Sequence, residues 1–309
     1  DKLKVFTGNC HRELAEEICE YLGTSLVDGS ISRFKDGEIS IRINETVRGA
    51  DVFVVQPTSP PVNENIMELL VVIDALRRAS ARRITAVVPY YGYARQDRKA
   101  QPRDPITAKL VANIITKAGT RRLLSIDFHA PQIQGFFDIP VDHLYSAPIM
   151  IDYFKKKGLE NLTAVAPDVG AVKRVRGFAE SLDIPMAIID KRRPKANVAE
   201  VQNVIGDVKG RNVVLVDDII DTAGTITEAA RVLKEKGAAN VYGCGTHGLF
   251  SGPAVDRLKK APFTELIITN TIPQRNNIEL DNLKVLSVAP LLGEAIDRIF
   301  KDLSVSVLF

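Results

Sequence analysis

Short runs of β-branched and other apolar residues recur along the 309-residue chain. Runs of this length are typical of buried strands and are too short for helices. We expect strands at 52–55, 84–88, 123–126, 163–166, 186–189, 213–216, 241–246 and 266–269. The first residues, DKLKVFTGN, are strand-like as well and contain no apolar signal region.

Between several of these runs the apolar spacing changes to that of an amphipathic helix. The apolar positions of segment 63–80 fall on one helical face: Ile66, Leu70, Ile73 and Leu76. Segments 107–118 and 225–236 end at Gly119 and Gly237, residues suited to a helix C-terminus. Strands that alternate with helices predict an α/β fold, with mainly parallel sheets flanked by helices and ligands beyond the carboxyl ends of the strands.

The number of expected strands exceeds one open sheet, so we expect two domains. Turn-prone residues at 143–148 place the boundary there. The two domains are then 1–145 and 146–309, and a hydrophobic fraction of 45% is enough for two cores.

The charge balance gives no indication of a nucleic-acid or membrane partner. The chain has 41 basic and 38 acidic residues, a bias too small to indicate nucleic-acid or membrane binding. No apolar run is long enough to span a membrane. Three cysteines without metal-type spacing fit a reducing compartment, so we expect a cytoplasmic protein.

The most specific motif is VVLVDDIIDTAGT at 213–225, where an apolar strand ends in acids and a helix then begins. Backbone N–H groups at such a helix N-terminus bind phosphate, and we expect Gly224 to permit close approach while Thr222 and Thr225 add hydroxyl donors. Asp217 and Asp218 would repel phosphate, so they face sugar hydroxyls or hydrated Mg²⁺. A phosphorylated sugar satisfies both halves. The alternative is an ordinary strand-to-helix turn with an Asp cap.

This segment resembles the loop that binds phosphoribosyl pyrophosphate in phosphoribosyltransferases and in ribose-phosphate diphosphokinases. Five further stretches resemble the diphosphokinases alone, in the order of that family, and cover nearly the whole chain: RFKDGE at 33–38, YARQDRK at 93–99, DFHAPQIQGFFDIPVDHL at 127–144, APDVGAVKR at 166–174 and DKRRPKANVAEV at 190–201. The resemblance implies two similar phosphoribosyltransferase-type domains. It also implies an N-terminal ATP-contacting and allosteric domain, to which the C-terminal tail returns, and a C-terminal ribose 5-phosphate-binding domain.

The resemblance also assigns roles to residues. The expected ribose 5-phosphate ligands are Arg193, Asp217, Asp218, Asp221, Thr222, Ala223, Gly224 and Thr225. Those for ATP are Phe34, Asp36, Gly37, Glu38, Arg95, Gln96 and His129, and the diphosphate loop contains Asp168, Gly170, Lys173 and Arg174. Mg²⁺ is expected at His129 and Asp168, although Mg²⁺ chemistry alone does not favour a His ligand. Without the family, 33–38 would be a hairpin turn, 95–99 a charged surface loop and 168–174 a Gly-bearing helix entry.

The densest basic cluster, at 191–195, has two interpretations. Such a cluster is usually a solvated surface or a nucleic-acid patch, and the latter would bind duplex DNA with a steep salt dependence. In the family, the corresponding segment closes over the reacting phosphates, and Lys191 and Arg193 match its catalytic cations. Cations aimed at the transferring phosphoryl group supply most of the catalysis in such reactions.

The resemblance implies transfer of the β,γ-diphosphoryl group of Mg-ATP to the C1 hydroxyl of ribose 5-phosphate, with AMP as the leaving group. It also implies a homo-oligomer, a dimer with shared active sites or a hexamer, in which residues 34–38 reach a neighbouring subunit. Phosphate and ADP are the expected effectors, at an allosteric site formed by Thr46, Arg48, Arg78, Ser80, Ser304, Ser306 and Phe309. Two alternatives are a catalytically silent associate of the family and a phosphoribosyltransferase. Cys10, His11, His143 and His247 receive no role beyond packing or capping.

Overall fold

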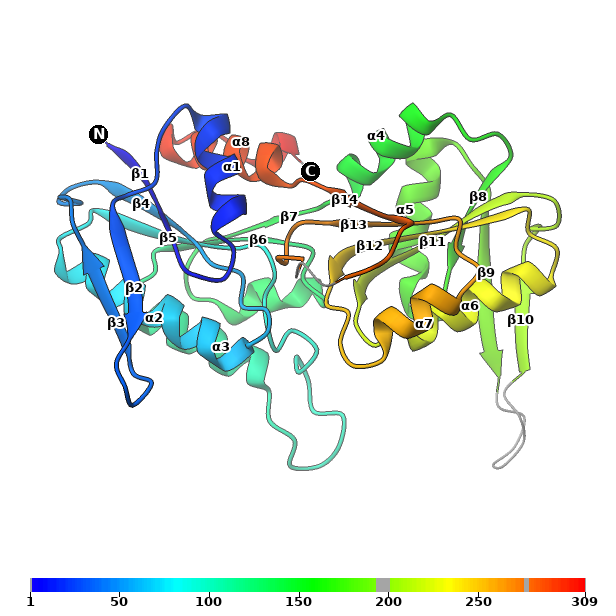
Figure 1. Cartoon of the computed structure of the whole chain (residues 1–309), viewed down its shortest axis with the longest axis horizontal. Helices are drawn as coiled ribbons and strands as arrows, with labels where there is room; N and C mark the ends of the chain where they lie inside the picture. Colours follow the sequence, from blue (N-terminus) through cyan, green and yellow to red (C-terminus); the bar gives the residue numbers. More distant parts are fainter. Residues whose placement is uncertain (1, 193–200, 275–277, 309) are drawn as a thin grey trace. The chain divides into compact units, whose positions relative to one another are not determined.

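The computed structural model describes residues 2–192, 201–274 and 278–308, and its chain forms two compact units. Unit 1 comprises residues 1–145, 271–273 and 287–309, and unit 2 comprises residues 146–270 and 274–286. The last helix of the chain therefore belongs to the same unit as its first strand. Each unit is an α/β layer structure, which confirms the expected fold class (Figure 1).

Unit 1 is built on a five-stranded, wholly parallel sheet in the order β1-β4-β5-β6-β7. Its strands are β1 (Leu3–Thr7), β4 (Asp51–Val55), β5 (Arg83–Val88), β6 (Arg122–Ile126) and β7 (Val141–Leu144). The helices are α1 (Arg12–Leu22), α2 (Val62–Arg78), α3 (Thr107–Ala118) and α8 (Ala289–Phe300), with short 3₁₀ turns η1 (Pro131–Phe136) and η3 (Ser306–Leu308). Helices α1 and α8 cover one face of the sheet, and α2 and α3 cover the other (Figure 1).

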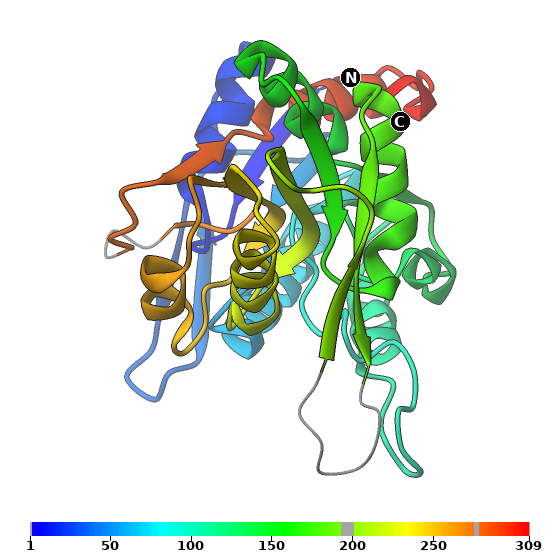
Figure 2. The ribbon, with the colours of Figure 1, turned by 90° about the vertical axis from the view of Figure 1, so that its right-hand side faces the viewer.

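Unit 2 contains a seven-stranded sheet in the order β10-β9-β8-β11-β12-β13-β14, parallel except for β10. Its strands are β8 (Leu162–Ala166), β9 (Met186–Arg192), β10 (Val201–Ile205), β11 (Asn212–Ile220), β12 (Asn240–Gly248), β13 (Glu265–Thr269) and β14 (Leu283–Leu286). The helices are α4 (Ala147–Lys157), α5 (Val172–Leu182), α6 (Gly224–Glu235) and α7 (Ala254–Lys260), with the 3₁₀ turn η2 (Val169–Ala171). Strands β9 and β10 form a two-stranded arm (Figure 2).

The expected strands and helices all form, and their limits follow burial. In α3, the buried residues Ala108, Val111, Ala112 and Ile115 recur at helical spacing, and Gly119 ends the helix with a φ of 130°. All five residues of β8 are buried, as expected for a central parallel strand. Three strands continue clearly beyond their predicted ends: β9 to Arg192, β11 through Asp217 and Asp218 to Ile220, and β12 to Gly248.

An antiparallel hairpin was not predicted as a strand pair. Strands β2 (Gly29–Arg33) and β3 (Ile39–Ile43) pair with each other, and the turn between them carries Gly37 at a φ of 96°. The turn is closed by hydrogen bonds from the Phe34 N–H to the Glu38 carbonyl and from the Gly37 N–H to the Phe34 carbonyl, at 2.9 and 3.0 Å. Within the chain, residues 33–38 thus form the hairpin turn that their sequence suggests without the family.

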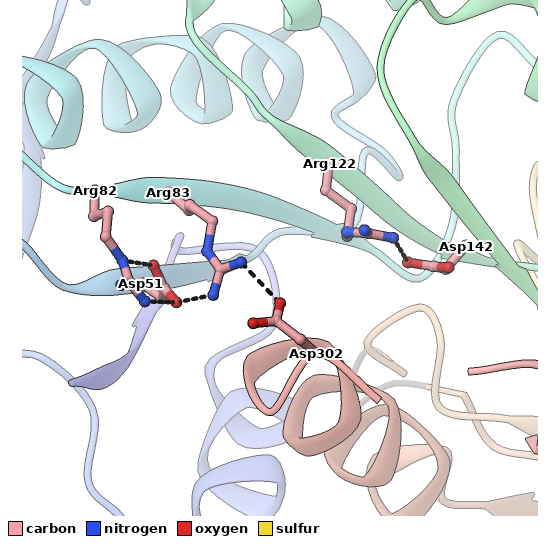
Figure 3. Close-up of polar contacts among 6 residues, drawn as sticks. All are labelled: Asp51, Arg82, Arg83, Arg122, Asp142 and Asp302. Atoms are coloured by element: carbon pink, nitrogen blue, oxygen red, sulfur yellow. Dashed lines mark hydrogen bonds and ion pairs between the residues drawn. The ribbon is translucent and has the colours of Figure 1, made fainter. Parts of the chain in front are cut away.

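A buried carboxylate ties together the strand starts in unit 1. Asp51 accepts hydrogen bonds from Arg82, at 2.7 and 2.9 Å, and from Arg83 at 2.5 Å, and Arg83 also contacts Asp302 of the C-terminal segment (Figure 3). The Asp51 side chain is 3% exposed. Burial alone would raise the pKa of Asp51, but the two guanidinium groups outweigh it and hold the pKa below its ordinary value.

We expect Asp51→Asn to lower the free energy of unfolding by about 2 kcal/mol at pH 7, because a charge-assisted network loses its carboxylate. Since a lowered pKa contributes stability above the unfolded pKa, the difference should shrink as pH falls below about 4. Urea unfolding at several pH values measures it. Asp74→Asn, which breaks the exposed Arg78–Asp74 pair, is the control and should leave stability unchanged. Equal losses in the two variants would contradict the role of Asp51.

Candidate active site

The loop between β11 and α6 has the form of an anion-binding turn. Ala223 is buried and left-handed, with a φ of 59°, and α6 begins at the next residue. Thr222 and Thr225 are exposed at this helix N-terminus, where unpaired N–H groups and the helix dipole attract anions. The structure thus places Thr222 and Thr225 at a helix N-terminus, the position that the motif predicts for them.

Gly224 lies beside an arginine side chain of α7. The backbone of Gly224 is not left-handed, and a Cβ there would lie 3.2 Å from Nη1 of Arg257. Arg257 also donates from Nη1 to the Thr222 carbonyl at 3.0 Å. The glycine therefore makes room for an arginine of α7 that holds the loop. Sequence reasoning missed Arg257, because nothing in its surroundings marks it.

Two carboxylates lie side by side at the end of β11. The Asp218 N–H donates to Oδ1 of Asp217 at 2.8 Å, and Nη1 of Arg174 lies 3.4 Å from Oδ1 of both acids. Asp218 is buried, and Asp217 is partly exposed. Burial raises the pKa of Asp217 to about 7, and the neighbouring Asp218 adds to the shift against the opposing charge of Arg174.

The expected diphosphate loop adjoins these acids, because β8 and β11 are neighbouring strands. Asp168 follows β8 and caps η2, with Oδ1 accepting the Ala171 N–H at 3.0 Å. A Cβ on Gly170 would lie 3.2 Å from the same Oδ1, so glycine keeps this turn compact. Lys173 and Arg174 lie in the first turn of α5, and the contacts of Arg174 join the loop to β11.

The expected catalytic cations lie on or beyond β9. The Lys191 backbone pairs with Gln202 of β10, and Arg193 lies outside the described residues. Strands β8, β9 and β11 are parallel, so their carboxyl ends share one edge of the sheet. The backbone of Lys191 therefore lies toward the same edge of the sheet as the diphosphate loop and the paired acids.

The expected ATP residues of unit 1 also follow parallel strands. Arg95 and Gln96 lie after β5, and exposed His129 lies after β6, at the same edge of the sheet. Gln96 is fixed to α3, since its Oε1 accepts from the Thr107 hydroxyl at 2.6 Å and its carbonyl accepts the Ala108 N–H at 3.1 Å.

Buried His143 supports this edge. Its Nε2 accepts the Phe128 N–H at 2.9 Å, next to His129, and its ring packs against Phe128 and Tyr145. Sequence reasoning gave His143 no role beyond packing or capping. The contact shows that it also fixes the backbone that carries His129.

The turn at 34–38 presents an aromatic side chain to solvent. Phe34 is 58% exposed, and Asp36 accepts the Glu38 N–H at 3.1 Å within the turn. Arg33 pairs with Glu64 at 2.7 Å, which ties the start of the turn to α2.

Several of the expected allosteric residues lie near one another in unit 1. The Arg48 N–H donates to the Thr46 hydroxyl at 3.4 Å, and the Gly49 N–H donates to the carbonyl of left-handed Ser80 at 2.9 Å. The Ser304 and Ser306 hydroxyls are 2.7 Å apart. Arg78 pairs with Asp74, and Phe309 lies outside the described residues.

The described side chains contain no ready-made metal cluster. Within residues 2–192, 201–274 and 278–308, no group of three or more His, Cys, Asp or Glu side chains is arranged to hold a metal ion. His129 belongs to unit 1 and Asp168 to unit 2. A hydrated Mg²⁺ held by one or two carboxylates and substrate phosphates needs no such group, and the Asp217–Asp218 pair supplies suitable oxygen ligands.

Comparisons with known proteins identify the family. The family model described as the N-terminal domain of ribose phosphate pyrophosphokinase matches residues 3–119, and that of the phosphoribosyl synthetase-associated domain matches residues 191–309. A ribose-phosphate pyrophosphokinase of Caldanaerobacter subterraneus is 60% identical over 100% of this chain and 98% of its own length. The chain belongs to the ribose-phosphate pyrophosphokinase family.

Two further relatives of this family are similar to the chain over nearly its whole length. That of Bacillus caldolyticus is 58% identical over 100% of this chain and 98% of its own length. The crystal structure of phosphoribosylpyrophosphate synthetase from Mycobacterium smegmatis is 42% identical, covers 98% of this chain and 100% of its own, and superimposes with a TM-score of 0.92. The relatives span both units, so the likeness extends beyond the phosphate loop.

We expect Asp217→Asn to change how stability depends on pH. The pKa of Asp217 is raised from 3.8 to about 7 in the folded chain, so stability is highest below pH 3.8 for this group and decreases as pH rises to about 7. The side chain of the variant cannot ionise. The melting temperature of the variant minus that of the wild type should therefore increase as pH rises across this range, and calorimetry measures it.

The control is Asp207→Asn, at an exposed position of unit 2. Its difference from the wild type should stay constant with pH. A constant difference for Asp217→Asn as well would contradict the raised pKa.

Proposed function

We propose that this chain transfers the β,γ-diphosphoryl group of Mg-ATP to the C1 hydroxyl of ribose 5-phosphate, giving 5-phosphoribosyl 1-diphosphate and AMP. The C1 oxygen forms a bond to the β-phosphorus, the bond between that phosphorus and the α,β-bridging oxygen breaks, and the hydroxyl proton is released. The observation that carries the proposal is the loop from Asp217 to Thr225, which combines a turn suited to phosphate with two acids in a chain that belongs to this family.

The ribose 5-phosphate ligands follow from this loop. The N-terminus of α6, with residues 221–225, holds the 5-phosphate through N–H groups and the Thr222 and Thr225 hydroxyls. Asp217 and Asp218 accept hydrogen bonds from the ribose diol. Arg174 and Arg257 position the acids and the turn.

Catalysis comes from charge and position. Asp168, Gly170, Lys173 and Arg174 form the diphosphate loop, and Lys191 and Arg193 stabilise the negative charge that develops on the transferring group and on AMP. Little covalent work is left to the protein in such a transfer, so the alignment of the two substrates supplies the rest of the rate.

The ATP ligands come from the three stretches of unit 1. The exposed ring of Phe34 stacks on adenine, with Asp36, Gly37 and Glu38 in the same turn. Arg95, Gln96 and His129 bind base, ribose or phosphate. Residues 34–38 serve the active site of a neighbouring subunit, so the protein acts as a homo-oligomer, a dimer or a hexamer.

Mg²⁺ accompanies ATP in this proposal. His129 and Asp168 would hold it on the ATP side, and Asp217 and Asp218 beside the ribose. When bound, the ion neutralises charge on the phosphate oxygens. The chain's own residues bind and orient the two substrates and exclude water from the reacting groups.

We also propose that small effectors regulate the protein and that it works in the cytoplasm. Phosphate and ADP act as effectors at the site formed by Thr46, Arg48, Arg78, Ser80, Ser304, Ser306 and Phe309. The helices of the described chain are all too short or too polar to cross a membrane. The described cysteines are free thiols, in keeping with the reducing cytoplasm.

The proposal predicts that the protein makes AMP from Mg-ATP only when ribose 5-phosphate is present. Lys191→Ala should lower that rate by about 10³-fold or more, because a cation is lost from the transition state. Chromatography of the nucleotides, with phosphate and Mg²⁺ present, measures both. Lys155→Ala, at an exposed position of α4, is the matched control and should keep full activity.

Three results would point elsewhere. ADP as the product would indicate an ordinary kinase. No turnover by the wild type would indicate the silent associate. Wild-type activity in Lys191→Ala would remove the basic segment from catalysis.

Thr225→Val tests the phosphate loop separately. Its hydroxyl is a donor to the 5-phosphate, so the KM for ribose 5-phosphate should rise about tenfold while kcat changes little. Thr264→Val, far along the chain at an exposed position of the same unit, should leave KM unchanged. A fall in kcat with an unchanged KM would show that Thr225 does not bind the ground-state phosphate.

A further inference from the structure

A basic pocket lies in unit 1, away from the strand ends of the proposed active site. It has a volume of about 870 Å³ and is lined by residues at the ends of α2 and α3 and at the starts of β5 and β6. Parallel strands begin at one edge of a sheet and end at the other. The pocket therefore opens at the edge opposite Arg95, Gln96 and His129.

Four cations contribute to the lining of this pocket: Arg77, Arg82, Lys117 and Arg121. Arg82 is already bonded to Asp51 (Figure 3). In the part of the chain that the structure describes, the side chains of the other three make no hydrogen bond or ion pair. The pocket thus holds three charges available to an anion.

Helix ends account for part of this charge. The negative ends of α2 and α3 favour cations nearby, which explains Arg77 and Lys117 as helix-end residues. Arg121 belongs to neither helix. Gly119 leaves room for the Arg77 side chain, because a Cβ at Gly119 would lie 2.8 Å from the Arg77 Cδ.

A buried hydroxyl provides independent support for a ligand. Thr120 lines the pocket and is 2% exposed, and its Oγ1 has no hydrogen-bond partner within the described residues. Neighbouring Thr116, by contrast, donates to the Ala112 carbonyl at 2.8 Å. Buried hydroxyls are almost always bonded, so the one of Thr120 calls for a partner from outside the chain.

From the pocket, its three cations and the Thr120 hydroxyl, we propose that this is a second anion site, which binds a small molecule carrying a phosphate group. Arg77, Lys117 and Arg121 bind the phosphate oxygens, as guanidinium and ammonium groups commonly do. The volume exceeds that of phosphate alone and lies in the range of organic ligands. Asp138 is the carboxylate of the lining, and it accepts from hydroxyl groups of an organic phosphate. None of the expected allosteric residues lines this pocket.

Hydrogen–deuterium exchange of the full chain tests the site at residues 113–123. Glucose 6-phosphate should slow exchange there and unphosphorylated glucose should not. Lys117→Gln with Arg121→Gln should weaken this protection at least about tenfold, because charge-assisted bonds are lost. Lys155→Gln with Lys236→Gln removes the same charge from exposed positions of unit 2 and should keep the protection.

A comparison of glucose 6-phosphate with inorganic phosphate distinguishes a phosphorylated sugar from free phosphate as the ligand. Asp138→Asn should weaken binding of glucose 6-phosphate and strengthen binding of inorganic phosphate if the ligand is a phosphorylated sugar. If inorganic phosphate is the ligand, it should bind the wild type at least as tightly as glucose 6-phosphate. Either result supports a phosphate site.

Thr120→Val distinguishes a ligand contact from a structural hydroxyl. Since the hydroxyl is buried without a partner, a methyl group in its place should raise the melting temperature of the unliganded protein by about 2 °C. The same change should weaken binding of the phosphate probe about tenfold. A structural hydroxyl would instead lower the melting temperature and leave binding unchanged, which would overturn the assignment.

Three further results would overturn the proposal: no protection by either anion, protection that survives in Lys117→Gln with Arg121→Gln, or protection that appears without anion as the protein concentration rises. The last would assign the pocket to carboxylates of a second copy of the chain.

Discussion

The parallel arrangement of the strands determines where each kind of charge lies in this protein. Most neighbouring parallel strands are joined through a helix, so helix N-termini gather at the carboxyl edge of a sheet and helix C-termini gather at the amino edge. In unit 2, the carboxyl edge carries the start of α6 and the paired acids of β11. In unit 1, the amino edge carries Arg82, Arg83 and their carboxylate partner. In each sheet, the topology thus determines which edge receives helix N-termini and which receives helix C-termini.

The proposed active site combines groups that oppose one another electrostatically. The proposed phosphate-binding turn and the two carboxylates lie within nine residues of sequence, from Asp217 to Thr225. Arg174 lies between the acids and the diphosphate loop and offsets part of their charge. The raised pKa of Asp217 shows that one guanidinium is not enough to keep this acid readily ionised. A substrate that brings hydroxyls and a cation to the acids would complete the balance.

Sequence patterns predicted the strands, the helices and the turn from β11 into α6, because each depends on residues close together in the chain. They missed contacts between distant residues. Asp51 and Arg82 are 31 positions apart in the sequence, and Arg257 and Thr222 are 35 positions apart. The length of β11 was underestimated because two acids in a row are unusual in a strand. Residues 33–38 are a different case. Their hairpin turn can be predicted from the residues themselves, whereas their contact with ATP is expected only from the family resemblance. Lys191 and Arg193 rest on the family resemblance, and the pocket beside Thr120 had no signal in the sequence.

The acid pair has a consequence for how ligand binding is measured. A cation that approaches Asp217 favours its ionised form, so near neutral pH part of the population releases a proton on binding. The buffer takes up that proton with its own enthalpy of ionisation. The apparent heat of binding would then differ between phosphate and Tris buffers at the same pH, although the contacts formed in the site are identical.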